Sequence, residues 1–334
     1  MRPSRIIAVA VGALLTWSCS AGDDGSTGAA PTQTTVERAD AQEQQPQWTQ
    51  LAPVPTARTE VAAAAARGNI YVIGGFSDAG TVATVEIYDI GTDSWNSGPD
   101  LPIAVNHAMA TTLGGEIYAV GGYLGPGVEN PTDRAFVLRD GSWVEIASMP
   151  ARRGAGGMVR AKGKLWVVGG VEPDGLATQT FVYDPDTDNW RTRRGVPTDR
   201  QHLGAAAFKG RIYVAGGRTS GLDSNMATTE RYNIATRKWA ALADMPTARG
   251  GLAATATSDG FIVAAGGEGV DGTFDEVEAF DVSTRKWRSL PNMPTPRHGL
   301  GVVAVGTIVY VIAGGPQPGL HFSDANEAID LADL

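Results

Sequence analysis

Residues 70–75 read IYVIGG, and a β-rich run ending in a glycine pair returns at five further points in the chain. The pairs fall at 74–75, 121–122, 169–170, 216–217, 266–267 and 314–315. Tryptophans recur at 48, 95, 143, 190, 239 and 287, each seven residues before a proline that follows an apolar residue. Each proline lies 19 or 20 residues before its glycine pair, so the chain contains six copies of one unit of 47 to 50 residues.

Each unit has the composition of four short strands. Small and apolar residues follow the proline, as in 61–66, and a polar turn such as 67–69 leads into the run that ends at the glycine pair. A variable loop, a third run such as 86–89 and a turn then precede the tryptophan run. Short β-rich runs separated by turn residues predict strands, and four strands in nearly 50 residues are the size of one propeller blade.

A double glycine, a tyrosine–aspartate pair and then a tryptophan form a pattern that resembles the Kelch repeat, and the resemblance covers residues 47–334. It implies an all-β fold, a six-bladed Kelch-type β-propeller with four antiparallel strands per blade. The second unit departs from the pattern, because its third run reads FVLR at 136–139 and its turn before Trp143 is short.

The ends of the repeat region predict how the ring closes. The last glycine pair is followed by a third run near 327–330 but by no tryptophan, whereas Trp48 precedes every glycine pair. We therefore expect the strand around 47–51 to complete the last blade and remove the exposed edges. The small residues after each proline should line a narrow channel, and the tryptophans should pack between blades.

Residues 1–19 have the pattern of an export signal. Arg2 and Arg5 precede an apolar run at 6–15, which is too short to span a bilayer but suits a signal peptide. Cys19 follows LLTWS at 14–18 and resembles the lipidated cysteine of a bacterial lipoprotein, although Trp17 is bulky for such a motif. Lipidation at Cys19 and simple secretion are both kept as hypotheses. Residues 20–46 are polar and small and predict a disordered linker.

The net charge of the chain limits the classes of partner that we expect it to bind. The chain of 334 residues has a formal net charge of −9, and loss of Arg2 and Arg5 with the leader would bring it to about −11. An acidic protein of this kind is not expected to bind nucleic acid or to carry a polybasic patch for anionic lipid. We expect a monomer that lies outside the cytoplasm, either secreted, periplasmic or on the cell surface.

Most signatures of catalysis are absent from the sequence: it contains no HExxH, P-loop, nucleophile elbow or CxxC motif. Copper-radical oxidases that resemble this fold need a tyrosine cross-linked to cysteine, and Cys19 is the sole cysteine. Asp184, Asp186 and Asp188 have the spacing that opens a calcium loop, but Asn189 and Gly195 stand where that loop needs glycine and glutamate. We therefore predict neither a metal site nor a cofactor.

One set of polar residues recurs just after the prolines. Arginine lies three places after the proline in five units, and Val105 interrupts the series. Two places further lie Glu60, His107 and His202, which period two would put on the same strand face, with His298 on the opposite face. The candidate ligand-binding residues at the channel mouth are therefore Arg58, Glu60, His107, Arg153, Arg200, His202, Arg249 and Arg297.

A ring of guanidinium groups could bind a carboxylate or phosphate bidentately. Alternatively, each arginine bonds to carbonyls or to an acidic side chain on a neighbouring blade. Variable loops after the glycine pairs, the longest at 123–133 and 218–228, are a second candidate surface.

Two functions follow. The favoured one is a non-catalytic recognition module that binds a protein, peptide or glycan outside the cytoplasm. The other is an enzyme that acts on an acidic sugar, since the six-bladed periplasmic Kelch proteins that this chain resembles include sialic-acid epimerases. Glu60, His107 and His202 would then be the acid/base candidates.

Overall fold

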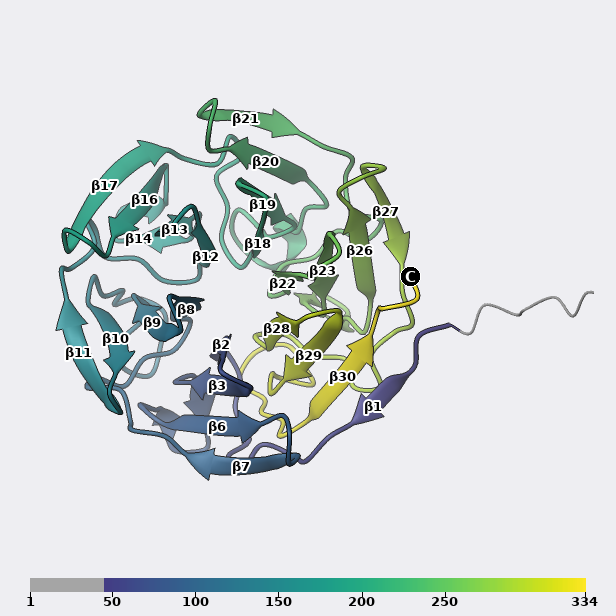
Figure 1. The fold of residues 1–334 in the computed structure, drawn as a ribbon, viewed down its shortest axis with the longest axis horizontal. Helices are drawn as coiled ribbons and strands as arrows, with labels where there is room; N and C mark the ends of the chain where they lie inside the picture. Colours follow the sequence, from purple (N-terminus) through teal and green to yellow (C-terminus); the bar gives the residue numbers. More distant parts are fainter. Residues whose placement is uncertain (1–44) are drawn as a thin grey trace, which may run out of the picture. The chain divides into compact units, whose positions relative to one another are not determined.

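A computed structural model describes residues 45–334, which form six antiparallel sheets around a central channel (Figure 1). Each sheet has four strands, with one strand beside the channel and one at the rim. The prediction of a six-bladed all-β propeller is confirmed. Residues 1–19, Cys19 among them, and nearly all of the linker at 20–46 lie outside the described residues.

Blades 1 to 3 follow the order of the chain from the channel outward. Blade 1 consists of β2 (Ala62–Ala66), β3 (Asn69–Ile73), β6 (Val85–Asp89) and β7 (Ser94–Ser97). Blade 2 consists of β8 (Met109–Leu113), β9 (Glu116–Val120), β10 (Ala135–Arg139) and β11 (Ser142–Ile146). Blade 3 consists of β12 (Gly157–Ala161), β13 (Lys164–Val168), β16 (Gln179–Asp184) and β17 (Asn189–Arg194).

Blades 4 to 6 repeat this arrangement, except that the outer strand of blade 6 comes from the other end of the described region. Blade 4 consists of β18 (Gly204–Phe208), β19 (Arg211–Ala215), β20 (Thr229–Asn233) and β21 (Lys238–Ala241). Blade 5 consists of β22 (Ala253–Ala256), β23 (Phe261–Ala265), β26 (Val277–Asp281) and β27 (Lys286–Ser289). Blade 6 consists of β28 (Gly301–Val305), β29 (Ile308–Ile312), β30 (Asn326–Asp330) and β1 (Trp48–Gln50).

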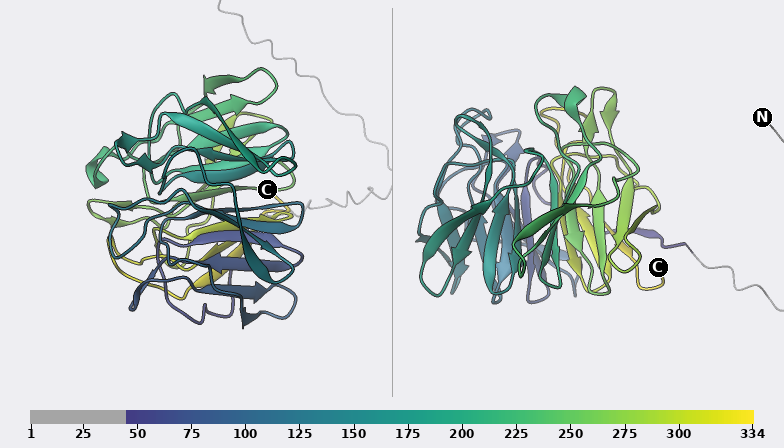
Figure 2. Two further views of the ribbon diagram at one scale, coloured as in Figure 1. Left: turned by 90° about the vertical axis from the view of Figure 1, so that its left-hand side faces the viewer. Right: turned by 90° about the horizontal axis from the view of Figure 1, so that it is seen from above.

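The loops after the glycine pairs contain the remaining elements. Three blades carry a two-stranded ribbon there: β4 (Phe76–Ser77) with β5 (Gly80–Thr81), β14 (Val171–Glu172) with β15 (Gly175–Leu176), and β24 (Glu268–Gly269) with β25 (Gly272–Thr273). Blade 4 carries a short 3-10 helix, η1 (Leu222–Ser224), in the loop after its glycine pair, which projects from the propeller (Figure 2). No helix within 45–334 has the length and apolar character to cross a membrane.

β1 closes the ring as the sequence predicts. It pairs antiparallel with β30, with Trp48 opposite Ile329 and Gln50 opposite Glu327. The indole nitrogen of Trp48 also donates a hydrogen bond of 2.9 Å to the carbonyl of Pro291, after the outer strand of blade 5. The first and last strands of the propeller thus belong to one sheet, so the ring is closed by hydrogen bonds within blade 6.

Blade 2 keeps four strands despite its unusual sequence. β10 and β11 are joined by Asp140 and Gly141, whose φ values are 51° and 78°. Two consecutive left-handed residues are what a two-residue hairpin turn needs, so the shortened turn continues the blade.

The strands beside the channel are built from small residues because neighbouring blades approach closely there. β2 is five consecutive alanines. A Cβ added to Gly301 of blade 6 would lie 2.6 Å from the Cβ of Ala63 in blade 1, and one on Gly204 would lie 2.8 Å from that of Ala254. These contacts are below normal van der Waals distance, so larger side chains cannot fit.

The tryptophans join adjacent blades, as predicted. The indole nitrogen of Trp95 in blade 1 donates to the carbonyl of Ala52, just after the outer strand of blade 6, at 2.8 Å. The same bond recurs from Trp143 to the carbonyl of Pro99 in the next blade, again at 2.8 Å. Each indole also packs on its own blade, as Trp95 does on Tyr88 with ring centroids 5.2 Å apart. The repeated tryptophan therefore fixes the spacing between blades.

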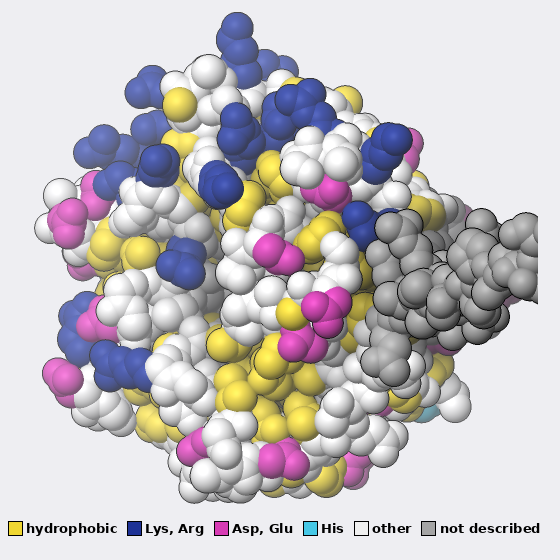
Figure 3. Space-filling model, turned by 45° about the vertical axis from the view of Figure 1, so that its right-hand side comes forward, with side chains coloured by type: hydrophobic (Ala, Val, Ile, Leu, Met, Phe, Trp, Pro, Cys, Tyr) yellow, Lys and Arg dark blue, Asp and Glu magenta, His cyan; other side chains and the backbone are white. Residues whose placement is uncertain are grey.

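Basic side chains gather on part of the surface in spite of the acidic net charge. Figure 3 shows Lys and Arg side chains clustered over the blades at the top of the view, where blades 3 to 5 lie. Exposed basic residues of these blades include Lys162, Arg194, Lys209, Arg237 and Arg285. The absence of a polybasic patch for anionic lipid stays a prediction, since net charge averages over the whole chain and does not report where its basic residues lie.

Candidate functional site

The five repeated arginines lie inside the blades. Arg58 is 0% exposed; its Nη1 donates to the carbonyl of Gly74 at 2.8 Å, and its Nη2 lies 2.7 Å from Glu86 Oε2. Both partners belong to blade 1, the same blade as the arginine. The guanidinium group therefore provides a hydrogen-bond donor for the carbonyl of Gly74, the first glycine of the pair that follows β3.

Three other blades repeat this ion pair between the arginine three places after the proline and a glutamate of the third strand. Arg200 pairs with Glu230 at 2.6 Å, Arg249 with Glu278 at 2.6 Å, and Arg297 with Glu327 at 2.5 Å. All three arginines are 0% exposed.

Blades 2 and 3 have other residues at the positions of the arginine–glutamate pair. In blade 3, Phe181 stands in place of the glutamate, so Arg153 stacks over this ring at 3.8 Å and pairs instead with Glu172 of the loop ribbon. In blade 2, Val105 and Phe136 fill the two positions, and each is 3% exposed. The arginine and its partner therefore change together.

The arginines consequently do not face the channel as a ring. Period two placed them on the same strand face as Glu60, His107 and His202, and this was wrong for a local reason. The residues that follow each arginine are bridges and bends, and Glu60 itself has a φ of 53°. A left-handed residue turns the chain, so side chains on its two sides no longer alternate as in a strand.

Glu60 belongs to a ring of six equivalent left-handed residues, one in each blade. The six are Glu60, His107, Ala155, His202, Gly251 and Gly299, with φ of 53°, 51°, 53°, 52°, 71° and 58°. The backbone N–H of five of them donates to the carbonyl of the counterpart in the preceding blade, as from His107 to Glu60 at 3.0 Å and from Gly299 to Gly251 at 2.9 Å. The circle is completed by Val61, whose N–H donates to the carbonyl of Gly299 at 3.2 Å. This backbone ring surrounds one mouth of the channel.

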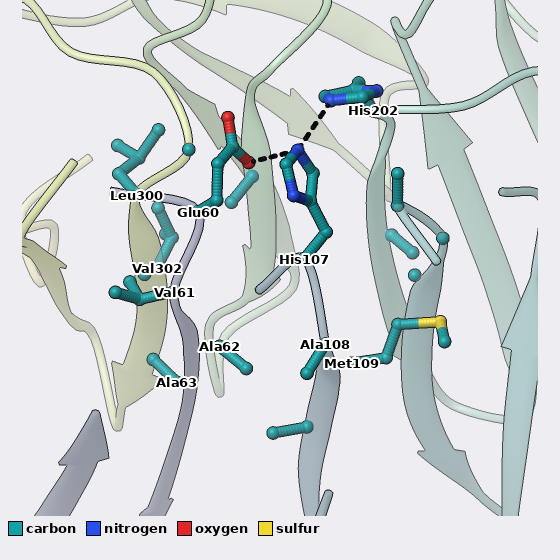
Figure 4. A pocket seen from close by; sticks show the side chains of 18 of the residues that line it. Glu60, Val61, Ala62, Ala63, His107, Ala108, Met109, His202, Leu300 and Val302 are labelled. Atoms are coloured by element: carbon teal, nitrogen blue, oxygen red, sulfur yellow. Dashed lines mark hydrogen bonds and ion pairs between the residues drawn. The ribbon is translucent and has the colours of Figure 1, made fainter. Parts of the chain in front are cut away.

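Three members of the ring carry polar side chains, and these point toward one another (Figure 4). His107 Nε2 lies 3.1 Å from Glu60 Oε2 and 3.1 Å from His202 Nε2. These three residues were predicted from the sequence to lie together at the channel mouth, and they do meet there. The predicted position of the arginines beside them was wrong.

The opposite side of Glu60 contacts a second group of buried charges. His298 Nδ1 lies 3.1 Å from Glu60 Oε1 and 3.5 Å from Glu268 Oε2, and Arg218 Nη1 lies 2.9 Å from Glu268 Oε1. His298 was expected on the opposite face; the left-handed turn at Gly299 brings it into the cluster instead.

Sequence reasoning missed Glu268 and Arg218, although a signal was present. Both directly follow a glycine pair, where other blades have Phe76, Tyr123 or Val171. A charged residue in a position that is otherwise apolar marks a departure from the repeat and could have identified both residues.

The cluster sets the charge of its members. Burial alone would raise the pKa of Glu60, but the neighbouring His107, His298 and His202 lower it far below its ordinary range. Burial lowers the pKa of His107 and lowers that of His202 further. Burial would also lower the pKa of His298, but its hydrogen bond to Glu60 and the nearby carboxylates raise it. Near neutral pH, Glu60 is therefore an anion, whereas His107 and His202 are neutral.

The cluster opens onto a cavity of about 140 Å³ in the channel. Below the polar ring the walls are small and apolar, with Ala62, Ala108, Gly156 and Ala253 among them. This volume is below the roughly 300–1,000 Å³ of typical small-molecule sites. It suits waters, an ion or a small part of a larger ligand.

The comparisons agree with this architecture. Residues 106–315 match the family model described as KLHDC2/KLHL20/DRC7 Kelch-repeats domain, and residues 57–102 match the Kelch motif. Kelch-like protein terF of Aspergillus terreus is 29% identical over 235 residues, covering 63% of this chain and 50% of that protein. Human Kelch-like protein 23 is 28% identical over 204 residues, covering 60% of this chain and 36% of that protein. The chain thus spans half or less of the length of these curated relatives.

Among solved structures, that of YjhT superimposes with a TM-score of 0.73 at 16% identity and covers 85% of this chain and 97% of that one. A six-bladed ring in which every blade carries a glycine pair is a Kelch-type β-propeller. The matched family model spans more than half of the sequence, and the chain belongs to the Kelch-repeat family.

Proposed function

We propose that this chain is a recognition module that works outside the cytoplasm and binds a protein partner through the loops around the Glu60 mouth of the channel. The Kelch-like relatives support a role in protein binding. The location rests on the export-signal pattern of residues 1–19.

The loops at this mouth are held to one another, which gives the surface a fixed shape. Thr273 Oγ1 of blade 5 donates to the carbonyl of Pro316 in the blade 6 loop at 2.9 Å. Asn225 Nδ2 of blade 4 donates to the carbonyl of Glu268 in blade 5 at 2.7 Å. A preorganised surface loses little conformational entropy on binding, which favours recognition.

Exposed apolar side chains on these loops are the observation that carries the proposal. Val270 is 67% exposed, Leu320 is 60% exposed and Val128 is 49% exposed, and all three lie in loops that follow glycine pairs. Exposed apolar surface with a polar rim marks sites that contact other proteins, and we propose these side chains as the anchors. A peptide could use the same anchors, whereas a glycan would favour exposed polar and aromatic groups.

The alternative enzyme on an acidic sugar keeps its acid/base candidates, because Glu60, His107 and His202 meet at the mouth. The repeated arginines, which were to bind the carboxylate of the sugar, are not accessible to it. They are 0% exposed and bonded within their blades. The small cavity adds to this difficulty. The geometry therefore favours recognition.

Chemical cross-linking in cells that produce the protein, followed by mass spectrometry, tests the proposal. We expect cross-links to one partner protein in the loops at 124–130, 268–273 and 316–322. The double variant Val270→Asp/Leu320→Asp should lose that partner. The control Val144→Asp/Val305→Asp, which changes exposed apolar residues away from these loops, should retain it.

Equal recovery by both variants would place the interface elsewhere. A thermal-shift screen with sialic acid and other sugar acids tests the alternative. A rise in melting temperature that depends on His107 and His202, together with turnover, would replace recognition by catalysis.

A further inference from the structure

We propose that Glu60, His107 and His202 bind a divalent first-row transition ion, represented here by Zn²⁺, at the mouth of the channel. This site is independent of whether the loop face binds a protein. Two imidazoles and one carboxylate are a ligand set that such ions favour.

The first argument concerns which nitrogen of each ring carries its hydrogen. His107 Nδ1 lies 2.7 Å from Asn106 Oδ1. Asn106 Nδ2 faces four acceptors: Thr81 Oγ1 at 2.9 Å, the carbonyls of Tyr123 and Gly125 at 3.4 Å, and the carbonyl of Gly127 at 3.5 Å. The amide group must therefore direct its oxygen at the ring, and Nδ1 of His107 is the protonated nitrogen. This leaves a lone pair on Nε2.

His202 repeats the arrangement, with Nδ1 3.0 Å from Gln201 Oε1. Each ring thus has a side-chain amide of the preceding residue on Nδ1 and presents Nε2 to the cluster. Metal-binding histidines are commonly oriented in this way by an acceptor on their other nitrogen.

With Gln201 Oε1 accepting from Nδ1 of His202, as Asn106 Oδ1 does from His107, three acceptor atoms converge without a donor between them. His107 Nε2 is 3.1 Å from both Glu60 Oε2 and His202 Nε2. A proton on Nε2 could be directed at only one of these neighbours at a time, whereas a metal ion binds all three. The three ligand atoms lie within 4.8 Å of one another.

The separations fit direct coordination. Ligand atoms about 2.0–2.1 Å from Zn²⁺ at angles of about 90–110° lie about 2.8–3.4 Å apart. The two measured separations of 3.1 Å fall within this range. The left-handed backbone ring holds Glu60 and both histidines on neighbouring carbonyl–amide bonds, so little movement is needed to bind the ion.

The carboxylate is also held for this role. His298 Nε2 faces the carbonyls of Gln317 and Gly319, both at 3.1 Å, while Nδ1 faces Glu60 Oε1. Both nitrogens of His298 face only acceptors, so both donate hydrogen bonds and the ring is a cation rather than a ligand. It fixes Oε1 of Glu60 and leaves Oε2 directed at His107. With three protein ligands, the ion keeps an open position toward the 140 Å³ cavity.

The test uses the full chain with Cys19→Ser in every variant, to remove the sole thiol, and without a polyhistidine tag. After treatment with a chelator, Zn²⁺ affinity is measured by competition with a chromophoric chelator. We expect one ion per chain. His107→Gly, His202→Gly and Glu60→Gln should each weaken binding by more than the roughly 10–100-fold expected for an outer partner, and Gln201→Ala should fall within that range.

Glycine is chosen because Gly251 and Gly299 occupy the same left-handed position in blades 5 and 6, which keeps the backbone ring intact. His321→Gly, at an exposed histidine that is not one of the three proposed ligands, is the matched control and should bind as the parent does. Thermal melting checks that each variant is folded.

A second measurement needs no substitution at the site. Long-range ¹H–¹⁵N spectra of the imidazole rings should show Nε2 of two histidines shifting on addition of one equivalent of Zn²⁺, with Nδ1 still protonated. Absence of stoichiometric binding, equal binding by the ligand variants, or a shift confined to His321 would overturn the proposal.

Discussion

Arg297 and Glu327 form an ion pair of 2.5 Å inside blade 6, and neither side chain is more than 2% exposed. Blade 2 fills the equivalent positions with Val105 and Phe136. Removing one member of a buried pair leaves a charge without its partner, whereas replacing both by apolar residues can be nearly neutral. Arg297→Val and Glu327→Phe should each lower the free energy of unfolding by about 3–5 kcal/mol. The double variant should lose less than either single one, as measured by urea denaturation.

The control for this cycle is the exposed pair Arg134–Glu145, whose side chains are 36% and 48% exposed. Glu145→Gln should change the free energy of unfolding by no more than about 1 kcal/mol. If the losses of unfolding free energy at Arg297 and Glu327 simply add in the double variant, an apolar pair like that of blade 2 cannot replace the buried ion pair. That result would contradict the prediction.

The same pairs show what could be learned from the sequence. The landmarks of the fold are local, because a glycine pair, a turn and a tryptophan each act within one blade, and their register therefore predicted the ring and its closure by β1. The glutamates of the third strand were visible at 86, 230, 278 and 327, in four of the five units that carry the arginine. That correlation indicates a pairing within the blade.

The channel mouth was only partly predictable for a different reason. Glu60, His107 and His202 were recognised as a set, but their convergence depends on left-handed backbone at residues other than glycine, which no propensity scale favours. Glu268 and Arg218 come from loops of blades 5 and 4, and the distance of these loops from Glu60 is set by the ring rather than by local sequence.

The pairing of Thr49 with Ala328 allows the closure of the ring to be tested covalently. Directly opposed residues of antiparallel strands have Cα atoms about 4.5–5.5 Å apart, within the range for a disulfide. In a Cys19→Ser background, Thr49→Cys/Ala328→Cys should form a disulfide that raises the free energy of unfolding by about 2–4 kcal/mol. Thermal melting of the oxidised and reduced forms measures this difference.

The off-register pair Thr49→Cys/Ile329→Cys is the control for this closure, because Ile329 lies opposite Trp48 and faces the other side of the sheet. It should oxidise slowly and give no comparable stabilisation. Equal oxidation of both pairs would mean that β1 is not held in the observed register.

Ala155 provides a test of the left-handed ring that changes no side chain of the polar cluster. Its φ is 53°, a conformation that costs an alanine about 1–2 kcal/mol and a glycine little. Ala155→Gly should therefore raise the free energy of unfolding by up to about 1 kcal/mol after the entropy cost of glycine, and Ala155→Val should lower it. The matched control is Ala206→Gly within β18, which should lose about 0.5–1 kcal/mol because that strand is regular. A loss in both glycine variants would contradict a strained ring at Ala155.

From the lipobox-like residues at 14–18 we propose that Cys19 is lipidated and tethers an exported protein to a membrane. We expect metabolic labelling with radioactive palmitate to label the parent chain and not Cys19→Ser, and the parent to fractionate with membranes while the variant is released. One dual-acylated cysteine is enough for stable anchoring of a folded domain. Trp17→Ala replaces the bulky residue before the motif's end by a small one and should increase the labelled fraction. A parent chain that is exported, unlabelled and released would establish simple secretion, and a chain retained in the cytoplasm would rule out the export signal.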